Sequence, residues 1–169
     1  MKHPSIAAAA ASLLFASLVL AAGNVAAQGA KSVAGTYTPV SVVTIDASGK
    51  RSDIFGPNPR GMLVLTADGR YSIILMRASL PKFSSNSRVK GTAEENQTVV
   101  AGSIAHFGKY TIDDKDKTIT FLVESSTFAN WDGAPQKRPF TVKGDEFKYT
   151  VAAVSGGTGS GEVVWKRMK

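Results

Sequence analysis

The feature of this sequence that most constrains its fold is the recurrence of short runs in which apolar and polar side chains alternate. Because neighbouring residues of a β-strand point to opposite faces, such runs predict strands that are buried on one side. Three pairs of runs are joined by short turns at 67–69, 113–117 and 143–145, which predicts three hairpins. The predicted strands are 36–45, 62–66, 70–77, 108–112, 118–125, 138–142, 146–151 and 161–168.

Short strands at this spacing are typical of an all-β sandwich or barrel. Most runs have one apolar or aromatic face and one polar face; in the run 138–142, for example, Arg138, Phe140 and Val142 share a face. A closed antiparallel barrel needs this pattern, since its inside is apolar and its outside is wet. The sequence therefore predicts an antiparallel barrel of about eight strands, with room for packed side chains or one small ligand.

A few polar side chains fall on the predicted inner face. An inward Arg is costly unless a carboxylate, a carbonyl or a ligand satisfies its hydrogen bonds. These side chains are therefore the first candidates for a binding site in the interior. They are Tyr71, His106, Tyr110, Arg138, Tyr149 and Arg167.

One segment departs from the strand pattern. Thr92 followed by Glu95 is the pattern of a capping box, which predicts a short helix over 93–101. The preceding segment, 81–91, is rich in Ser and basic residues and is typical of a surface loop. Loop and helix together could form a lid over a cavity. The Gly-rich segment 155–161 is expected to be a flexible hairpin loop.

The first residues have the organisation of a secretory signal peptide. A short positive start precedes the apolar, Ala-rich segment 6–22, and small residues at 25–27 fit a signal-peptidase site. The alternative is an N-terminal membrane anchor, for which the apolar segment is short. We therefore expect a signal peptide over 1–27, one domain over 28–169, a secreted or periplasmic protein, and no stable membrane insertion after cleavage.

Composition narrows the chemistry. Removal of residues 1–27 leaves 19 basic and 13 acidic side chains, a net charge of +6, but the cations are scattered and do not indicate nucleic-acid binding. The chain has no Cys, which excludes thiol nucleophiles and Cys-ligated zinc. His106 is the one His after residue 27, too few for a typical His-based metal site. We predict no metal and no cofactor.

Several short motifs, in this order and spacing, resemble the lipocalin-like domain family of the calycin superfamily. The resemblance implies a lipocalin-like barrel that binds a small, largely apolar or amphipathic molecule. It also implies closure of the barrel by a cation resting on an aromatic ring, with Tyr37 as the ring and Arg167 or, as the second candidate, Lys166 as the cation. Trp131, in a turn, is expected to cover a barrel rim. The motifs lie at 35–37, 55–61, 68–71, 94–96, 107–111, 128–133, 136–140 and 164–167.

The candidate ligand-binding residues each have a structural alternative. Arg138 either holds a ligand carboxylate or carbonyl, or pairs with an internal acid, for which Glu124 and Glu95 are the candidates. His106 is either a general base or a half-buried core residue with a satisfied hydrogen bond. Tyr71, Tyr110 and Tyr149 either line a pocket as hydrogen-bond donors or belong to the core.

Three hypotheses for function follow. The first is an exported lipocalin-like protein that binds a small apolar molecule in its barrel. The second is an isomerase, cyclase or hydrolase that uses His106, Arg138 and a Tyr in the same cavity. The third is an interaction module of the cell envelope that uses its basic outer surface. The oligomeric state and the identity of the ligand stay open.

Overall fold

The computed structural model describes residues 29–155 and 158–169, so the predicted signal peptide over 1–27 lies outside the described residues. The described chain begins with helical residues 29–33. None of the helices among the described residues is long and apolar enough to cross a bilayer. The elements that follow are β1 (Gly35–Ile45), β2 (Arg51–Asp53), β3 (Arg60–Leu65), β4 (Arg70–Met76), α2 (Ala93–Ala101), β5 (Ser103–Asp113), β6 (Thr118–Ser126), η1 (Ala129–Trp131), β7 (Pro135–Lys143), β8 (Glu146–Val151) and β9 (Ser160–Arg167).

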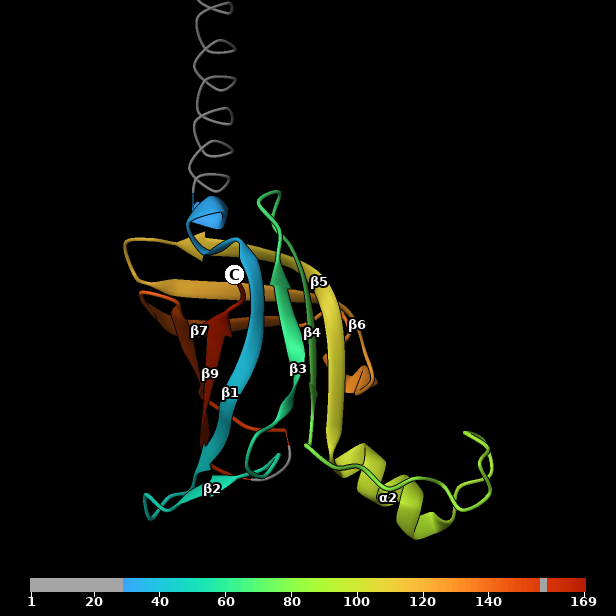
Figure 1. Cartoon of the computed structure of the whole chain (residues 1–169). Coiled ribbons are helices and arrows are strands. Elements are labelled where there is room, and N and C mark those ends of the chain that lie inside the picture. The colour runs from blue at the N-terminus through green and yellow to red at the C-terminus, as the bar shows by residue number, and fades with distance from the viewer. Residues whose placement is uncertain (1–28, 156–157) are drawn as a thin grey trace, which may run out of the picture.

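The strands form a closed antiparallel barrel, as predicted (Figure 1). From β3 to β9 each strand pairs with the next along the chain, and β1 closes the sheet by pairing with both β3 and β9. The short β2 pairs with the far part of β1 and is an extra strand that the sequence pattern did not predict. Its three residues are all exposed, so no apolar face marks it in the sequence.

Alternation predicted the inner face of most strands correctly. Tyr71, Ile73 and Leu75 of β4 are buried, as are Phe147 and Tyr149 of β8. One predicted inward residue is wrong, because Val142 is 43% exposed. β6 pairs with β7 only as far as Pro139. Val142 therefore lies beyond the end of β6, and β6 does not cover it.

The helix was also predicted correctly, with the same bounds, 93–101. Thr92 accepts a hydrogen bond from the Glu95 backbone N–H at 3.1 Å, and Glu95 accepts one from the Thr92 N–H at 2.8 Å, which is the capping box. Yet α2 buries none of its residues, and Figure 1 shows it beside the start of β5 rather than over the barrel. The lid expected from this segment is therefore not formed in this structure.

Candidate functional site

A chain of aromatic rings runs through the barrel interior. Neighbouring rings lie 4.6–5.9 Å apart between centroids, most of them edge to face, a favourable arrangement for aromatic pairs. The rings come from η1 and from β5, β4, β6, β8 and β1, so the chain of rings joins five strands of the barrel. In order, they are Trp131, His106, Tyr71, Phe121, Tyr149, Phe147 and Tyr37.

The last ring of this chain belongs to the part of the barrel that helical residues 29–33 cover (Figure 1). The Arg167 guanidinium lies 4.7 Å above the Tyr37 ring, in the arrangement that the family resemblance implied. Arg167 also donates to the Ala34 carbonyl, and the Tyr37 hydroxyl donates to the Val33 carbonyl at 2.6 Å. A side chain at Gly35 would collide with the Arg167 guanidinium, so this close approach requires Gly there.

Tyr110 lies in this same region, near Tyr37 and Arg167, and apart from the other candidate ligand-binding residues. Its hydroxyl donates to the carbonyls of Ala30, at 3.0 Å, and Thr66, at 2.7 Å. Ala30 and Val33 are themselves buried in the core. The Tyr110 hydroxyl therefore joins the helical residues 29–33 to the β3–β4 turn. We call Tyr37, Tyr110 and Arg167 the Arg167 cluster.

The remaining candidates meet around Arg138, which is 6% exposed. Its guanidinium lies 4.8 Å from the centroid of the Tyr149 ring and 5.2 Å from that of Phe121, and the two rings, 5.9 Å apart, lie toward the same side of the cation. Its Nη2 donates to the Gln136 side-chain carbonyl, and its Nε, also buried, has no hydrogen-bond partner. We call Tyr71, His106, Gln136, Arg138 and Tyr149 the Arg138 cluster.

The alternative in which Arg138 pairs with Glu124 or Glu95 is not what the structure shows. Glu124 faces outward and pairs with Arg70 at 2.7 Å. Glu95 serves the capping box and also accepts from the Ser84 backbone N–H at 2.8 Å. Among the described residues, no carboxylate lies within ion-pair distance of Arg138.

His106 and Tyr71 form a hydrogen-bonded pair in this cluster. The Tyr71 hydroxyl lies 2.9 Å from His106 Nδ1, and both side chains are buried. Burial, and next the positive charge of Arg138, lower the pKa of His106 from 6.5 to about 3. Burial raises the pKa of Tyr71. At neutral pH both groups are therefore uncharged, and the natural arrangement is a Tyr71 hydroxyl that donates to an unprotonated Nδ1.

Trp131 lies against this pair from the η1 segment. Its ring meets His106 edge to face at 5.4 Å, and Phe128 packs on its other side at 5.6 Å. Trp131 is half-buried and Phe128 is 39% exposed. The η1 segment thus places an aromatic cover between His106 and solvent, next to a cation and a neutral acid–base pair.

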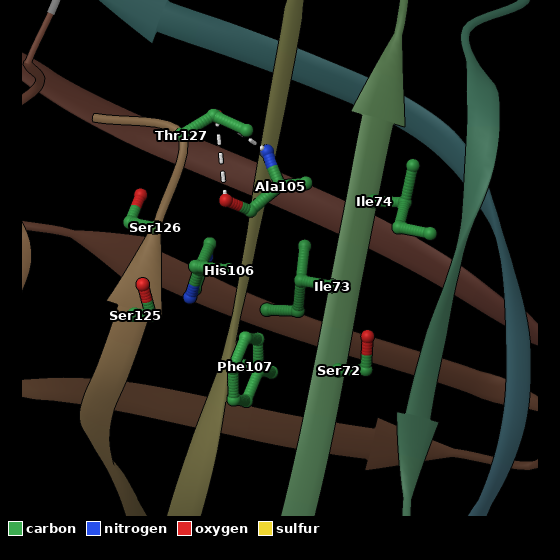
Figure 2. A pocket seen from close by; sticks show the side chains of 9 residues that line it. All are labelled: Ser72, Ile73, Ile74, Ala105, His106, Phe107, Ser125, Ser126 and Thr127. Atoms are coloured by element: carbon green, nitrogen blue, oxygen red, sulfur yellow. Dashed lines mark hydrogen bonds between the residues drawn. The ribbon is translucent and has the colours of Figure 1, made fainter. Parts of the chain in front are cut away.

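A hollow in the barrel wall is lined by the outward Phe107 and also by the inward, buried His106 and Ile73. It has a volume of about 410 Å³ and lies among β4, β5 and β6 (Figure 2). Thr127 crosses its upper part, where its hydroxyl accepts from the Ala105 N–H at 3.0 Å. Inside the barrel, rings of this chain contact the Arg138 cluster. No group of three potential metal-ligating side chains occurs among the described residues.

Sequence reasoning missed two members of this arrangement. Gln136 was overlooked because β7 begins at Pro135, three residues before the predicted start, and strand parity from there would have placed Gln136 inward beside Arg138. Phe121 is fully buried and lies on the inner face of β6, a strand for which no inward residues were predicted. Both signals were present in the alternation of the strands concerned.

Comparisons with known proteins agree with this architecture. A family model described as a lipocalin-like domain matches residues 34–168. A curated relative is the 4'-hydroxy-3'-methoxypropiophenone carrier protein ppsC of Aspergillus oryzae. The two sequences are 30% identical over 77 residues, a stretch that covers 42% of this chain and 69% of that protein.

Proposed function

The chain belongs to the lipocalin-like domain family, and we propose that it binds a small, largely apolar molecule in the barrel at the Arg138 cluster. The observation that carries this proposal is the cluster itself. A buried cation and an uncharged His–Tyr pair interrupt an otherwise apolar, aromatic interior beneath a partly exposed Trp. Binding sites for small molecules typically combine an apolar lining with a few placed polar groups.

The relative supports an aromatic ligand. The molecule after which this carrier protein is named is a small aryl ketone that also has a hydroxyl and a methoxy group. Such a molecule matches the interior of this chain in chemistry, since its ring could replace contacts within the ring chain and its oxygens could meet polar side chains. Because side chains now occupy the interior, binding requires Trp131 and its neighbours to move aside.

Native mass spectrometry and fluorescence titration test the proposal. The probes are 4'-hydroxy-3'-methoxypropiophenone, a polyphenol, a fatty acid and an isoprenoid. We expect at least one to bind saturably at one site and to change the emission of Trp131. Trp131→Phe should remove the emission change but keep binding visible by mass, because Trp165 is fully buried elsewhere in the core.

Neighbouring residues of β5 give a matched control for the site. His106 is buried on the inner face, whereas Phe107 is 48% exposed on the outer face, and both line the hollow in the wall. We expect His106→Ala to weaken binding and Phe107→Ala to leave it unchanged. Weaker binding in Phe107→Ala would move the ligand to the hollow in the wall, and no binding by any probe would contradict the proposal.

A second candidate function is an enzyme that acts on a small organic molecule, as an isomerase, cyclase or hydrolase. The observation that favours it is that His106, Tyr71 and Arg138 meet in one place. A neutral His can accept a proton, a protonated Tyr can donate one, and a cation can stabilise a developing oxyanion.

Hydrogen–deuterium exchange in ²H₂O tests this candidate. Exchange at carbons next to a ligand carbonyl, followed by NMR, would reveal proton abstraction. We expect catalysed exchange to be lost in His106→Gln. If the wild-type protein binds the carbonyl compound and catalyses no exchange and no other turnover, the binding function stands alone.

We also propose that the protein is exported. The motivation is the pattern of residues 1–27, in which a positive start, an apolar segment and small residues precede the predicted cleavage site. N-terminal sequencing of the protein recovered after expression in its source cells should give Gln28 as the first residue. Recovery of an intact Met1 in the cell interior would contradict export.

A further inference from the structure

Arg138 is a buried cation that has no acidic partner. Its side chain is 6% exposed, its Nε has no hydrogen-bond partner, and no described carboxylate pairs with it. A buried charge is costly unless it is paired and hydrogen-bonded, and a guanidinium carries five donors. Only one of these donors is used by another side chain, the carbonyl of Gln136.

Two aromatic rings contact the guanidinium but give it no strong acceptor. Phe121 and Tyr149 lie 5.2 and 4.8 Å from its central carbon, and their own centroids are 5.9 Å apart, so both rings lie toward one side of the cation. This contact stabilises the positive charge but does not satisfy the N–H donors. What is missing is therefore a hydrogen-bond acceptor for the N–H groups that remain, Nε among them.

The neighbouring titratable groups do not supply a negative charge. His106 is neutral because burial lowers its pKa, and Tyr71 stays protonated because burial raises its pKa. Glu124, one of the two acids considered as a partner for Arg138, is held on the outside by Arg70. The Arg138 cluster thus carries one uncompensated positive charge.

From these observations we propose that Arg138 forms a carboxylate subsite, so that the preferred ligands are small aromatic or aliphatic acids. The ligand carboxylate would meet the guanidinium edge, the geometry in which Arg and a carboxylate form two parallel hydrogen bonds. Gln136 would act as a positioning residue that holds the guanidinium in place. This inference rests on the proposed binding function and specifies the chemical class of the ligand.

Matched pairs of acids and esters test the subsite. The probes are phenylacetate, phenylpropionate and decanoate, each compared with its methyl ester by isothermal titration of the purified protein. A charge-assisted bidentate pair predicts that the acid binds at least about tenfold more tightly than its ester. Arg138→Met should remove that preference, because only the acid loses a charge-assisted pair.

A neighbouring residue of β7 provides the control. Lys137 is exposed and alternates with Arg138, so Lys137→Met removes the same charge from the outer face and should keep the acid preference. If Arg138→Met does not fold, Arg138→Lys and Gln136→Leu serve instead, and each should reduce the preference. Thermal unfolding separates the roles, since a purely structural Arg138 would lower the melting temperature of Arg138→Met by several degrees.

The outcomes distinguish this inference from the function on which it rests. Equal affinity for acids and esters, or an equal loss of both in Arg138→Met, would overturn the carboxylate subsite and leave the binding function intact. Failure of every acid and every ester to bind would overturn both. A preference for acids that Arg138→Met abolishes and Lys137→Met retains would establish the subsite.

Discussion

Two arginines in this barrel lie on tyrosine rings at nearly the same distance and yet differ in their hydrogen bonding. Arg167 lies 4.7 Å from the Tyr37 centroid, and Arg138 lies 4.8 Å from that of Tyr149. Arg167 donates to the backbone carbonyl of Ala34, whereas Arg138 has only the Gln136 side chain and a buried Nε without a partner.

The difference teaches which part of the interior is structurally complete. In the Arg167 cluster, backbone carbonyls accept from Tyr37, Tyr110 and Arg167, so these polar groups are engaged by the fold itself. In the Arg138 cluster, the polar groups bond to other side chains, and the buried Nε of Arg138 has no partner. A folded chain gains stability from the first arrangement, whereas the second is what a site for an external acceptor would require.

The largest expected effect concerns the Tyr37 ring in the Arg167 cluster. Tyr37→Ala should lower the free energy of unfolding by about 3–5 kcal/mol, because it removes a fully buried aromatic side chain and leaves a cavity. Urea denaturation measures this loss. The control is Phe107→Ala on the outer wall, where about half of the ring is already in water and the loss should stay under about 1.5 kcal/mol. Equal losses would show that the Arg167 cluster is not a stabilising centre.

The two arginines themselves give the next largest contrast. Arg167→Met should lower the free energy of unfolding by about 1–3 kcal/mol, since the Ala34 carbonyl loses its donor and Tyr37 loses the cation. Arg138→Met should change it by under about 1 kcal/mol or raise it, because a buried cation without an acid is replaced by an apolar side chain of similar length. Denaturation of both variants under one set of conditions measures the difference. A greater loss in Arg138→Met would reverse the comparison.

The sequence predicted which side chains face inward better than which of them meet, and the reason is physical. Alternation along a single strand is a local property, so it placed Tyr110, Arg138 and Arg167 on the inner face without knowledge of their neighbours. Which residues meet across the barrel depends instead on strand register. The contact between Trp131 and His106, for example, joins residues brought together by the pairing of β5 with β6.

The structure also shows why Glu124 does not reach Arg138. Ile119, Phe121 and Val123 of β6 are fully buried, so alternation along this strand turns Glu124 outward, where it pairs with Arg70. This signal was present in the sequence. The register change of β5 and β6 between Phe107 and Gly108, which alternation does not predict, leaves Glu124 without a partner in β5.

The next prediction concerns how the stability of the protein depends on pH through His106 of the Arg138 cluster. His106 has a pKa of about 3 in the folded state, below the usual 6.5, so the unfolded chain binds the proton more readily between these values. Stability is therefore fully present above pH 6.5 and falls as the pH is lowered toward 3, by about 1.5 kcal/mol between pH 6.5 and 5. Urea denaturation at several pH values measures the slope.

His106→Phe is the control for that slope, since His106 is the one His among the described residues. The variant should be insensitive to pH between 6.5 and 5, a range above the carboxyl pKa values that the structure lowers further, such as that of Asp46. If the wild-type protein and His106→Phe show the same slope, His106 is not held neutral by burial and the cluster contains a second cation.

The smallest expected effect is that of removing the Tyr110 hydroxyl, which belongs to the Arg167 cluster and not to the Arg138 cluster. Tyr110→Phe removes the donor to two carbonyls, of Ala30 and Thr66, and should lower the free energy of unfolding by about 1–2 kcal/mol. Thr44→Val is the control, because its hydroxyl makes an exposed hydrogen bond to the Ser52 carbonyl at 3.3 Å and its loss should matter by under about 0.5 kcal/mol. In ligand titrations Tyr110→Phe should bind as the wild-type protein does, because the Tyr110 hydroxyl belongs to the Arg167 cluster. Weaker binding at unchanged stability would instead place Tyr110 in the ligand site.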